Sequence, residues 1–184
     1  MITDGADWIQ EVLVRLFALG EASASRLSVV DWAVLGGILL FQRLCVHLGM
    51  WAYCLAVLPG TALHEAMHWL VAMALRARPS MPSIIPVRTA SGWRLGSVQF
   101  RAGYLRALPI ALAPLVLAPL GFWWATTFLP GKPWGAIYLA HAWISVCAFG
   151  AGFPSRQDWS IAAPALVVGG LVVGLATLAL YLYL

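Results

Sequence analysis

The chain has 184 residues, of which 62% are hydrophobic and only 10% charged, and its mean hydropathy is +0.86. This composition is typical of a polytopic membrane protein and leaves little room for a separate soluble domain. The net charge of +4 is not accompanied by a soluble nucleic-acid-recognition element, so we expect a lipid bilayer, and no nucleic acid, as a partner.

Residues 1–28 are predicted to form an N-terminal amphipathic arm and linker. From Asp7 to Leu19, apolar residues recur at helical spacing, while Glu11 and Arg15 lie on the opposite face. This pattern favours a helix that lies on the membrane or against the helix bundle. Residues 20–28 are expected to be a polar linker. The acidic start of the chain does not resemble a cleavable signal peptide.

Residues 29–184 are predicted to form one membrane-embedded domain. Its first span begins near Val29 and contains Arg43 and His47, so one face is expected to point toward protein or water rather than lipid. Whether these two residues line a water path stays open. Pro59-Gly60 is expected to break the helix, and Thr61 to cap a shorter helix that runs to about Leu75.

The segment 77–103 differs from the rest of the domain. Six arginines and no acidic residue occur between residues 76 and 106, which places this segment in the cytoplasm by the positive-inside rule. Residues 83–87 and 93–100 have the composition of strands and flank Thr89-Ala90-Ser91-Gly92, which predicts a β-hairpin. Gly96 is a candidate for a bulge.

Three apolar stretches follow, at residues 104–128, 134–150 and 161–183. The predicted fold is therefore an all-α polytopic membrane protein. We expect about five membrane helices, an N-terminal amphipathic helix and a small β-hairpin. Cys45, Cys54 and Cys147 are expected to be small buried hydrophobic residues. The predicted location is multi-pass, in a cell membrane of the bacterial inner-membrane type.

An H-E-x-x-H motif, His64-Glu65-Ala66-Met67-His68, lies within the apolar segment 61–73. Residues i and i+4 share one face of a helix, so the two imidazoles are placed to bind one metal ion. Glu65 lies about 100° around the helix, where a general base beside a metal site is expected. Three ionisable groups within five residues of a membrane helix are costly unless they have a function.

A catalytic zinc site usually has three protein ligands, so a third ligand is needed. After His68 the chain contains one carboxylate, Asp158, and one histidine, His141. Asp158 is a candidate ligand, with a helix-capping role or pairing with Arg156 as the alternative. His141 competes as the ligand, and its other candidate role is to donate a hydrogen bond to the oxyanion of a tetrahedral intermediate.

These features resemble the site-2 protease superfamily of intramembrane zinc metalloproteases, particularly its small members. The resemblance covers about residues 55–163 and rests on the H-E-x-x-H helix, the β-like segment after it, and a lone aspartate before a later span. It implies that His64, His68 and Asp158 bind Zn²⁺ and that Glu65 is the catalytic glutamate. The chain departs from the family pattern because Trp159, not glycine, follows Asp158.

The expected function is therefore zinc-dependent endopeptidase activity on a transmembrane or membrane-associated protein substrate, with the site toward the cytoplasm. Two alternatives remain open from the sequence. One is an inactive homologue that serves as a membrane scaffold or regulator, and the other is a zinc hydrolase of lipid amides. The oligomeric state and the substrate are not specified by any feature of the sequence.

Overall fold

The computed structural model describes residues 3–89 and 92–183. Over these residues the chain forms helices joined to one small antiparallel hairpin. The elements are α1 (Thr3–Ala24), α2 (Val29–Leu48), α3 (Met50–Ala74), β1 (Val87–Thr89), β2 (Gly92–Arg94), α4 (Tyr104–Leu112), a short 3-10 helix η1 (Ala113–Val116), α5 (Leu117–Phe128), α6 (Ala136–Ala151) and α7 (Arg156–Tyr183).

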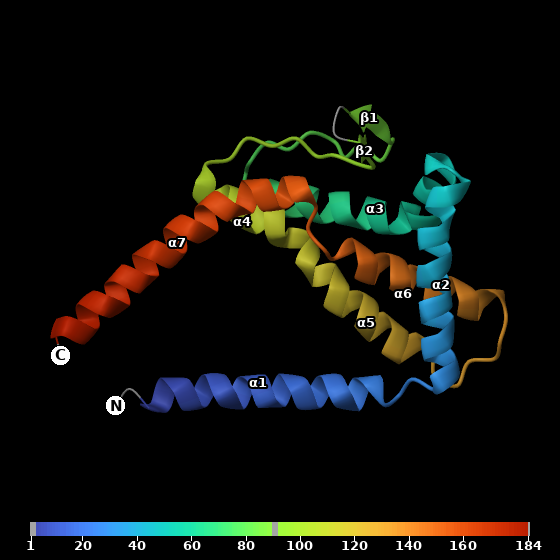
Figure 1. Cartoon of the computed structure of the whole chain (residues 1–184), viewed down its shortest axis with the longest axis horizontal. Coiled ribbons are helices and arrows are strands. Elements are labelled where there is room, and N and C mark those ends of the chain that lie inside the picture. Colours follow the sequence, from blue (N-terminus) through green and yellow to red (C-terminus); the bar gives the residue numbers. More distant parts are fainter. Residues whose placement is uncertain (1–2, 90–91, 184) are drawn as a thin grey trace.

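The helices pack around α3 and α6 (Figure 1). Helix α6 packs against α3 and α5, α2 packs against α3, and α4 packs against the beginning of α7. The remainder of α7 and most of α1 extend away from this body, toward the two ends of the chain. The hairpin lies on the outer side of α3.

Helix α1 is longer than predicted, because it continues to Ala24. The expected linker from residue 20 is therefore wrong, and only residues 25–28 separate α1 from α2. Glu21, Ala22 and Ala24 are good helix formers, which accounts for the extension. The apolar side chains of Ile9, Leu13 and Leu16 share one face of α1 and are exposed, so α1 is an amphipathic helix with an uncovered apolar face.

The boundary between α2 and α3 is at Gly49, not at Pro59-Gly60 as predicted. Gly49 has φ 120°, a conformation that residues with a Cβ rarely adopt, and it ends α2 after Leu48. Helix α3 then runs through Pro59 without interruption. The predicted short helix from Thr61 is instead the second half of a helix of 25 residues.

Neighbouring helices contact α3 beside its proline. The carbonyl of Ala56, three residues before Pro59, accepts hydrogen bonds from Gln42 Nε2 at 3.2 Å and from Trp143 Nε1 at 2.8 Å. The carbonyl that Pro59 itself leaves without a donor is that of Leu55, so these contacts hold the helix in place around the proline and do not replace the lost bond. Gly60 allows α6 to approach closely, because a Cβ at this position would lie 2.5 Å from the carbonyl oxygen of Cys147.

The predicted hairpin is present and extends beyond its two short strands. Val87–Thr89 pairs with Gly92–Arg94, Ser83 forms an isolated bridge with Ser97, and backbone hydrogen bonds continue to Arg101, whose N–H donates to Ala77. We call residues 77–101 the ribbon. Four residue steps lead from Ser83 to Val87, but three from Arg94 to Ser97, so the extra residue lies in the first strand and not at Gly96. Residues 90 and 91 of the predicted turn lie outside the described residues.

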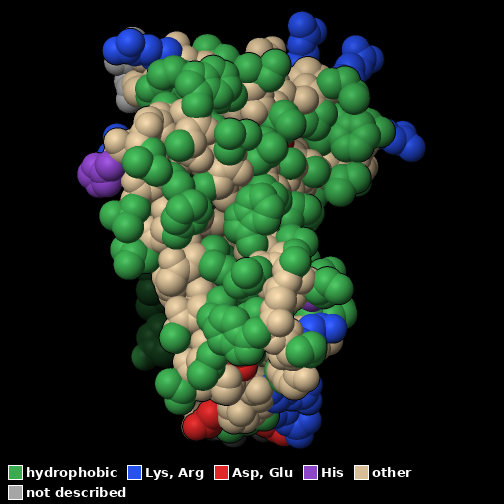
Figure 2. Space-filling model, turned by 90° about the vertical axis from the view of Figure 1, so that its right-hand side faces the viewer, with side chains coloured by type: hydrophobic (Ala, Val, Ile, Leu, Met, Phe, Trp, Pro, Cys, Tyr) green, Lys and Arg blue, Asp and Glu red, His purple; other side chains and the backbone are tan. Residues whose placement is uncertain are grey.

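Three helical stretches of the described chain are long and apolar enough to cross a membrane. They are Val29–Leu48, Tyr104–Phe128 and Arg156–Tyr183; Ala136–Ala151 is apolar but shorter. The predicted total of about five membrane helices stays a prediction. Viewed from the α2 side, hydrophobic side chains cover the middle of the molecule, and lysines and arginines gather toward its upper and lower ends (Figure 2).

Two small clusters form the buried core. One joins the beginning of α6 to α5 through Tyr138, Ala142 and Leu129. The Tyr138 hydroxyl donates to the carboxylate of Asp31, which also completes a capping box with Ser28 at the start of α2. The other cluster, Ala72, Ala77 and Ile110, joins α3 and the ribbon to α4, close to the H-E-x-x-H residues. Cys45, Cys54 and Cys147 are free thiols, the first and last of them buried.

Candidate metal centre

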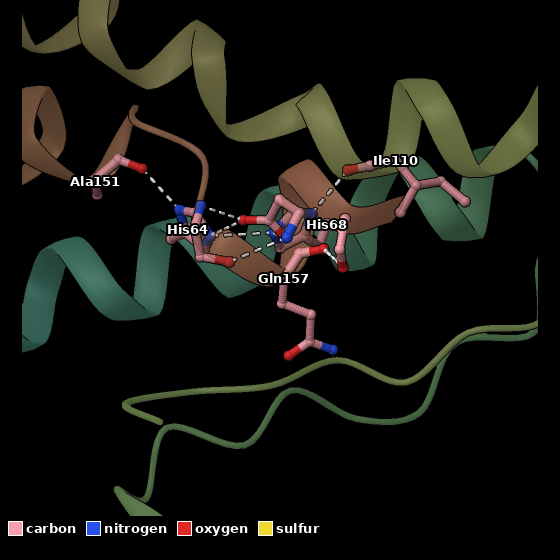
Figure 3. A network of polar contacts seen from close by, with 8 residues as sticks. His64, His68, Ile110, Ala151 and Gln157 are labelled. Carbon is pink, nitrogen blue, oxygen red and sulfur yellow. Dashed lines mark hydrogen bonds and ion pairs between the residues drawn. The ribbon is translucent and has the colours of Figure 1, made fainter. Parts of the chain in front are cut away.

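Three side chains from two helices converge at one point. His64 and His68 lie one turn apart on α3, and Asp158 lies in the first turn of α7 (Figure 3). Asp158 Oδ2 is 3.3 Å from His64 Nε2, and Asp158 Oδ1 is 3.1 Å from His68 Nε2. The two Nε2 atoms are 3.1 Å apart. The structure thus brings together the three residues that the sequence predicts as metal ligands.

Backbone carbonyls hold a hydrogen on the Nδ1 atom of both imidazoles. His64 Nδ1 is 2.7 Å from the carbonyl oxygen of Ala151, and His68 Nδ1 is 2.7 Å from that of Ile110. A carbonyl oxygen only accepts hydrogen bonds, so each Nδ1 carries the hydrogen and donates it. In the neutral imidazole, Nε2 is then an unprotonated acceptor. The Nε2 atoms of both histidines therefore face the Asp158 carboxylate with their lone pairs.

Asp158 takes its position from the start of α7. Its Oδ2 accepts a hydrogen bond from the Ser155 backbone N–H at 2.6 Å, while the Asp158 N–H lies 3.2 Å from Ser155 Oγ. This reciprocal pair begins α7 at Arg156, several residues before the predicted start of the last span at residue 161. The sequence left capping and metal binding as alternatives, and the structure places Asp158 where it caps the helix and also faces both histidines.

The group requires a cation. Two imidazole lone pairs and one carboxylate repel one another at 3.1–3.3 Å unless a proton or a metal ion lies between them. Metal–ligand distances of about 2.0–2.1 Å put the ligand atoms of a tetrahedral site about 3.3–3.4 Å apart. The observed spacing fits this geometry. His64, His68 and Asp158 could therefore hold a metal ion, with their ligand atoms within 4.8 Å of one another.

Glu65 lies beside the group and against the ribbon. Its residue is 7% exposed, and Gly96 of the ribbon packs directly on its side chain. A Cβ at Gly96 would lie 2.6 Å from Glu65 Oε1 and 2.9 Å from Glu65 Cδ. The sequence suggested a bulge at Gly96, whereas the structure shows that its missing side chain makes room for the Glu65 carboxylate.

A cleft of about 670 Å³ opens between α3 and the ribbon. The three converging residues, which we call the metal group, lie in its wall together with Glu65. Its other walls come from the second half of α2, the end of α6 and the beginning of α7. Gln157 extends from α7 toward the ribbon (Figure 3). Arg43 lines this cleft, while His47 is not among the residues that line it. Of these two residues, Arg43 therefore belongs to the cleft and His47 does not, and the water path considered from the sequence stays a prediction.

His141 lies elsewhere in the described chain. Its ring stacks on Phe128 with ring centroids 5.2 Å apart, and Trp124 lies at 5.8 Å. Its Nδ1 is buried without a hydrogen-bond partner among the described residues. His141 does not line the cleft and does not join the three-residue group. Its position therefore does not favour either the ligand role or the oxyanion role suggested from the sequence.

Comparisons with protein-family models, with curated proteins and with solved structures find no match to this chain.

The sequence missed the two carbonyl acceptors and the contact at Gly96. Ala151 and Ile110 act through their backbone, which no residue type indicates. For Gly96 a weak signal existed, because glycine within a strand indicates either a bulge or the close approach of another group.

Proposed function

We propose that this protein is a membrane-embedded, zinc-dependent endopeptidase. One observation carries the proposal: both H-E-x-x-H histidines donate from Nδ1 to backbone carbonyls, so their Nε2 atoms face the Asp158 carboxylate as lone pairs. Backbone or carboxylate partners of this kind are usual for histidines that bind a metal. Two histidines and one carboxylate are a donor set typical of zinc hydrolases.

Glu65 is the proposed general base. It belongs to the same helix as the two histidines and lines the same cleft. His64, His68 and Asp158 would hold the zinc ion, which would supply Lewis acidity for the attack of water on an amide carbonyl. Glu65 accepts the proton of the attacking water and delivers it to the nitrogen of the scissile C–N bond, which leaves as an amine.

A peptide is the proposed substrate, rather than a lipid amide, because one wall of the cleft is a β-ribbon. Residues 93–98 of the ribbon line the cleft, and residues 93 and 94 belong to strand β2, which pairs with β1. Extended peptides commonly bind along such strands. The resemblance to the site-2 protease superfamily points to the same substrate class, and the apolar helices place the reaction in or at a membrane.

The proposal is tested on the purified full-length chain in lipid nanodiscs. Bound metal is measured by elemental analysis, and cleavage is measured with unfolded membrane peptides and, separately, with lipid amides. We expect about one zinc per chain and cleavage of peptides only. Glu65→Gln should keep the zinc and lose cleavage by about 10³-fold or more, whereas His64→Ala should lose both.

His47→Ala is the matched control for His64→Ala, because His47 is an exposed histidine that does not line the cleft. It should change neither zinc content nor cleavage. Folded protein without stoichiometric metal would contradict the proposal, and would mean that a proton lies between the histidines and Asp158. Unchanged cleavage in Glu65→Gln would also contradict it.

A further inference from the structure

Three arginines line the cleft from three different elements: Arg43 on α2, Arg94 on β2 and Arg156 at the start of α7. In the part of the chain that the structure describes, no carboxylate lies within 4.0 Å of any of these guanidinium groups. All three side chains are exposed to the cleft or its rim. The cleft therefore presents three cations that form no ion pair among the described residues, although Arg94 is close enough to Glu65 to interact with it electrostatically.

Cations outnumber carboxylates in the cleft. Glu65 and Asp158 are its two carboxylates; Asp158 faces both histidines, and Glu65 interacts with Arg94 beyond ion-pair distance. The three arginines therefore give the cleft an excess of positive charge, which a bound metal ion would increase. A cleft lined by one sign of charge within low-dielectric walls attracts ligands of the opposite sign.

Arg43 has an unusual position for a charged residue. It lies within α2, a helix apolar enough to cross a membrane, with Phe41 before it in the sequence and Leu44 and Cys45 after it. A charged residue in such a helix is costly and commonly faces a cavity or a functional partner. The positive-inside rule accounts for arginines in loops, but it does not account for one within α2.

We propose that the cleft binds an extended peptide segment that carries a carboxylate side chain beside the scissile bond, and that Arg43 and Arg94 bind this carboxylate. A guanidinium group binds a carboxylate through two parallel hydrogen bonds, which gives this preference its geometry. The inference rests on the proposed function for the position of the scissile bond. The binding preference itself does not require cleavage, so the two are tested separately.

The experiment uses the full-length Glu65→Gln protein in nanodiscs of zwitterionic lipid. Three fluorescent peptides of one sequence are compared by anisotropy, with Glu, Gln or Lys at a single position. We expect the Glu peptide to bind most tightly, by about fivefold for each arginine that contacts it. The preference should shrink when salt is raised from about 0.05 M to about 0.5 M, because salt screens exposed charges.

Arg43→Gln and Arg94→Gln should each weaken binding of the Glu peptide and leave binding of the Gln peptide unchanged. Arg88→Gln is the matched control, because Arg88 lies on the same hairpin but does not line the cleft. Arg94→Glu should tighten binding of the Lys peptide relative to the protein that keeps Arg94. This is a gain of binding, which a misfolded variant does not produce.

Equal binding of the three peptides would overturn the inference, as would an equal effect of Arg88→Gln and Arg94→Gln. A further arm replaces the zwitterionic lipid by phosphatidylglycerol. If Arg43→Gln and Arg94→Gln reduce only the association with anionic lipid, the arginines bind lipid phosphate and the inference fails. A Glu preference in a protein that never cleaves would keep the inference and reject the proposed endopeptidase.

Discussion

Asp158 joins the helix start to the metal group through its two oxygens. Oδ2 accepts the Ser155 N–H and faces His64, while Oδ1 faces His68. The same carboxylate that begins α7 is therefore held in the orientation that the two imidazoles need. A ligand fixed by a second hydrogen bond loses little conformational entropy when a metal binds.

Gly96 is the second residue on which the site depends, because it sets the space available to Glu65. We expect Gly96→Ala to lower kcat by about 10- to 100-fold, since its Cβ displaces the Glu65 carboxylate by a distance that matters for proton transfer. Zinc content should stay at the wild-type value, because Glu65 is not among the three converging residues. Cleavage kinetics and elemental analysis of the same sample measure both.

Gly103→Ala is the control for this prediction. Gly103 follows the same ribbon, and nothing lies within 4 Å of a Cβ built there. It should cleave at the wild-type rate. An equal loss of activity in the two variants would mean that any added methyl group in this region disturbs the ribbon, and that Gly96 has no specific relation to Glu65.

At this scale, the sequence predicted three side chains that the structure brings together, but not the groups that orient them. The i, i+4 spacing of His64 and His68 follows from helix geometry, whereas Asp158 was one of two candidates for the third position, beside His141. The carbonyls of Ala151 and Ile110 could not be predicted, because any residue type supplies a carbonyl. Their position depends on how α6 and α4 pack against α3.

At the scale of elements, the contact between α3 and α6 connects stability to the site. Gly60 and His64 lie on one face of α3, and both face the end of α6. A Cβ at Gly60 would lie 2.5 Å from Cys147 O and 3.3 Å from the Ala151 side chain. The same close approach brings the Ala151 carbonyl to His64 Nδ1.

Gly60→Ala should therefore weaken both packing and metal binding. The added methyl group pushes α6 away from α3, and we expect unfolding to become easier by about 1–3 kcal/mol. Zinc affinity should fall by about tenfold or more, as is usual when a partner of a metal-binding histidine is displaced. Thermal denaturation and competition with a zinc chelator provide the two measurements.

Gly36→Ala serves as the comparison, because Gly36 lies within α2 with nothing within 4 Å of its missing Cβ. It should bind zinc normally and be as stable as the wild type or slightly more so, since alanine favours helices. If Gly60→Ala lowers stability but leaves zinc affinity unchanged, the Ala151 carbonyl does not hold His64 in place.

The helix order was largely predictable from hydrophobic runs, but the boundary at Pro59-Gly60 was not. A proline removes one backbone hydrogen bond and favours a helix end, but packing against other helices can outweigh this cost. Here Gln42 of α2 and Trp143 of α6 both donate to the carbonyl of Ala56, three residues before Pro59. This is tertiary information that the local sequence does not contain. The hairpin, by contrast, follows from local turn chemistry and was predicted.

At the scale of the whole molecule, charge is segregated along one direction. Arginines gather at the end that carries the ribbon, and a broad apolar region separates it from the charges at the other end (Figures 1 and 2). Helix α7 begins beside α4 near the ribbon and runs away from it toward the chain end. A bilayer around the apolar region would place the ribbon and the end of α7 on opposite sides.

Cysteine labelling with a membrane-impermeant reagent tests this arrangement. Met81 on the ribbon and Tyr183 at the end of α7 are both highly exposed. We expect Met81→Cys to react only in inside-out vesicles, with the arginine-rich ribbon in the cytoplasm, and Tyr183→Cys only in right-side-out vesicles. The unmodified chain, which has its own three cysteines, gives the background. Labelling of both positions from one side would contradict the proposed orientation.

The carbonyls that hold the histidines also fix when the group can form during synthesis. His64 and His68 leave the ribosome first, the Ile110 carbonyl follows, and the Ala151 carbonyl and Asp158 come last. A nascent chain that ends before residue 151 contains the complete H-E-x-x-H motif but lacks both Asp158 and one of the two carbonyl acceptors. The group of His64, His68 and Asp158 is thus complete only after α6 has docked on α3 and α7 has begun.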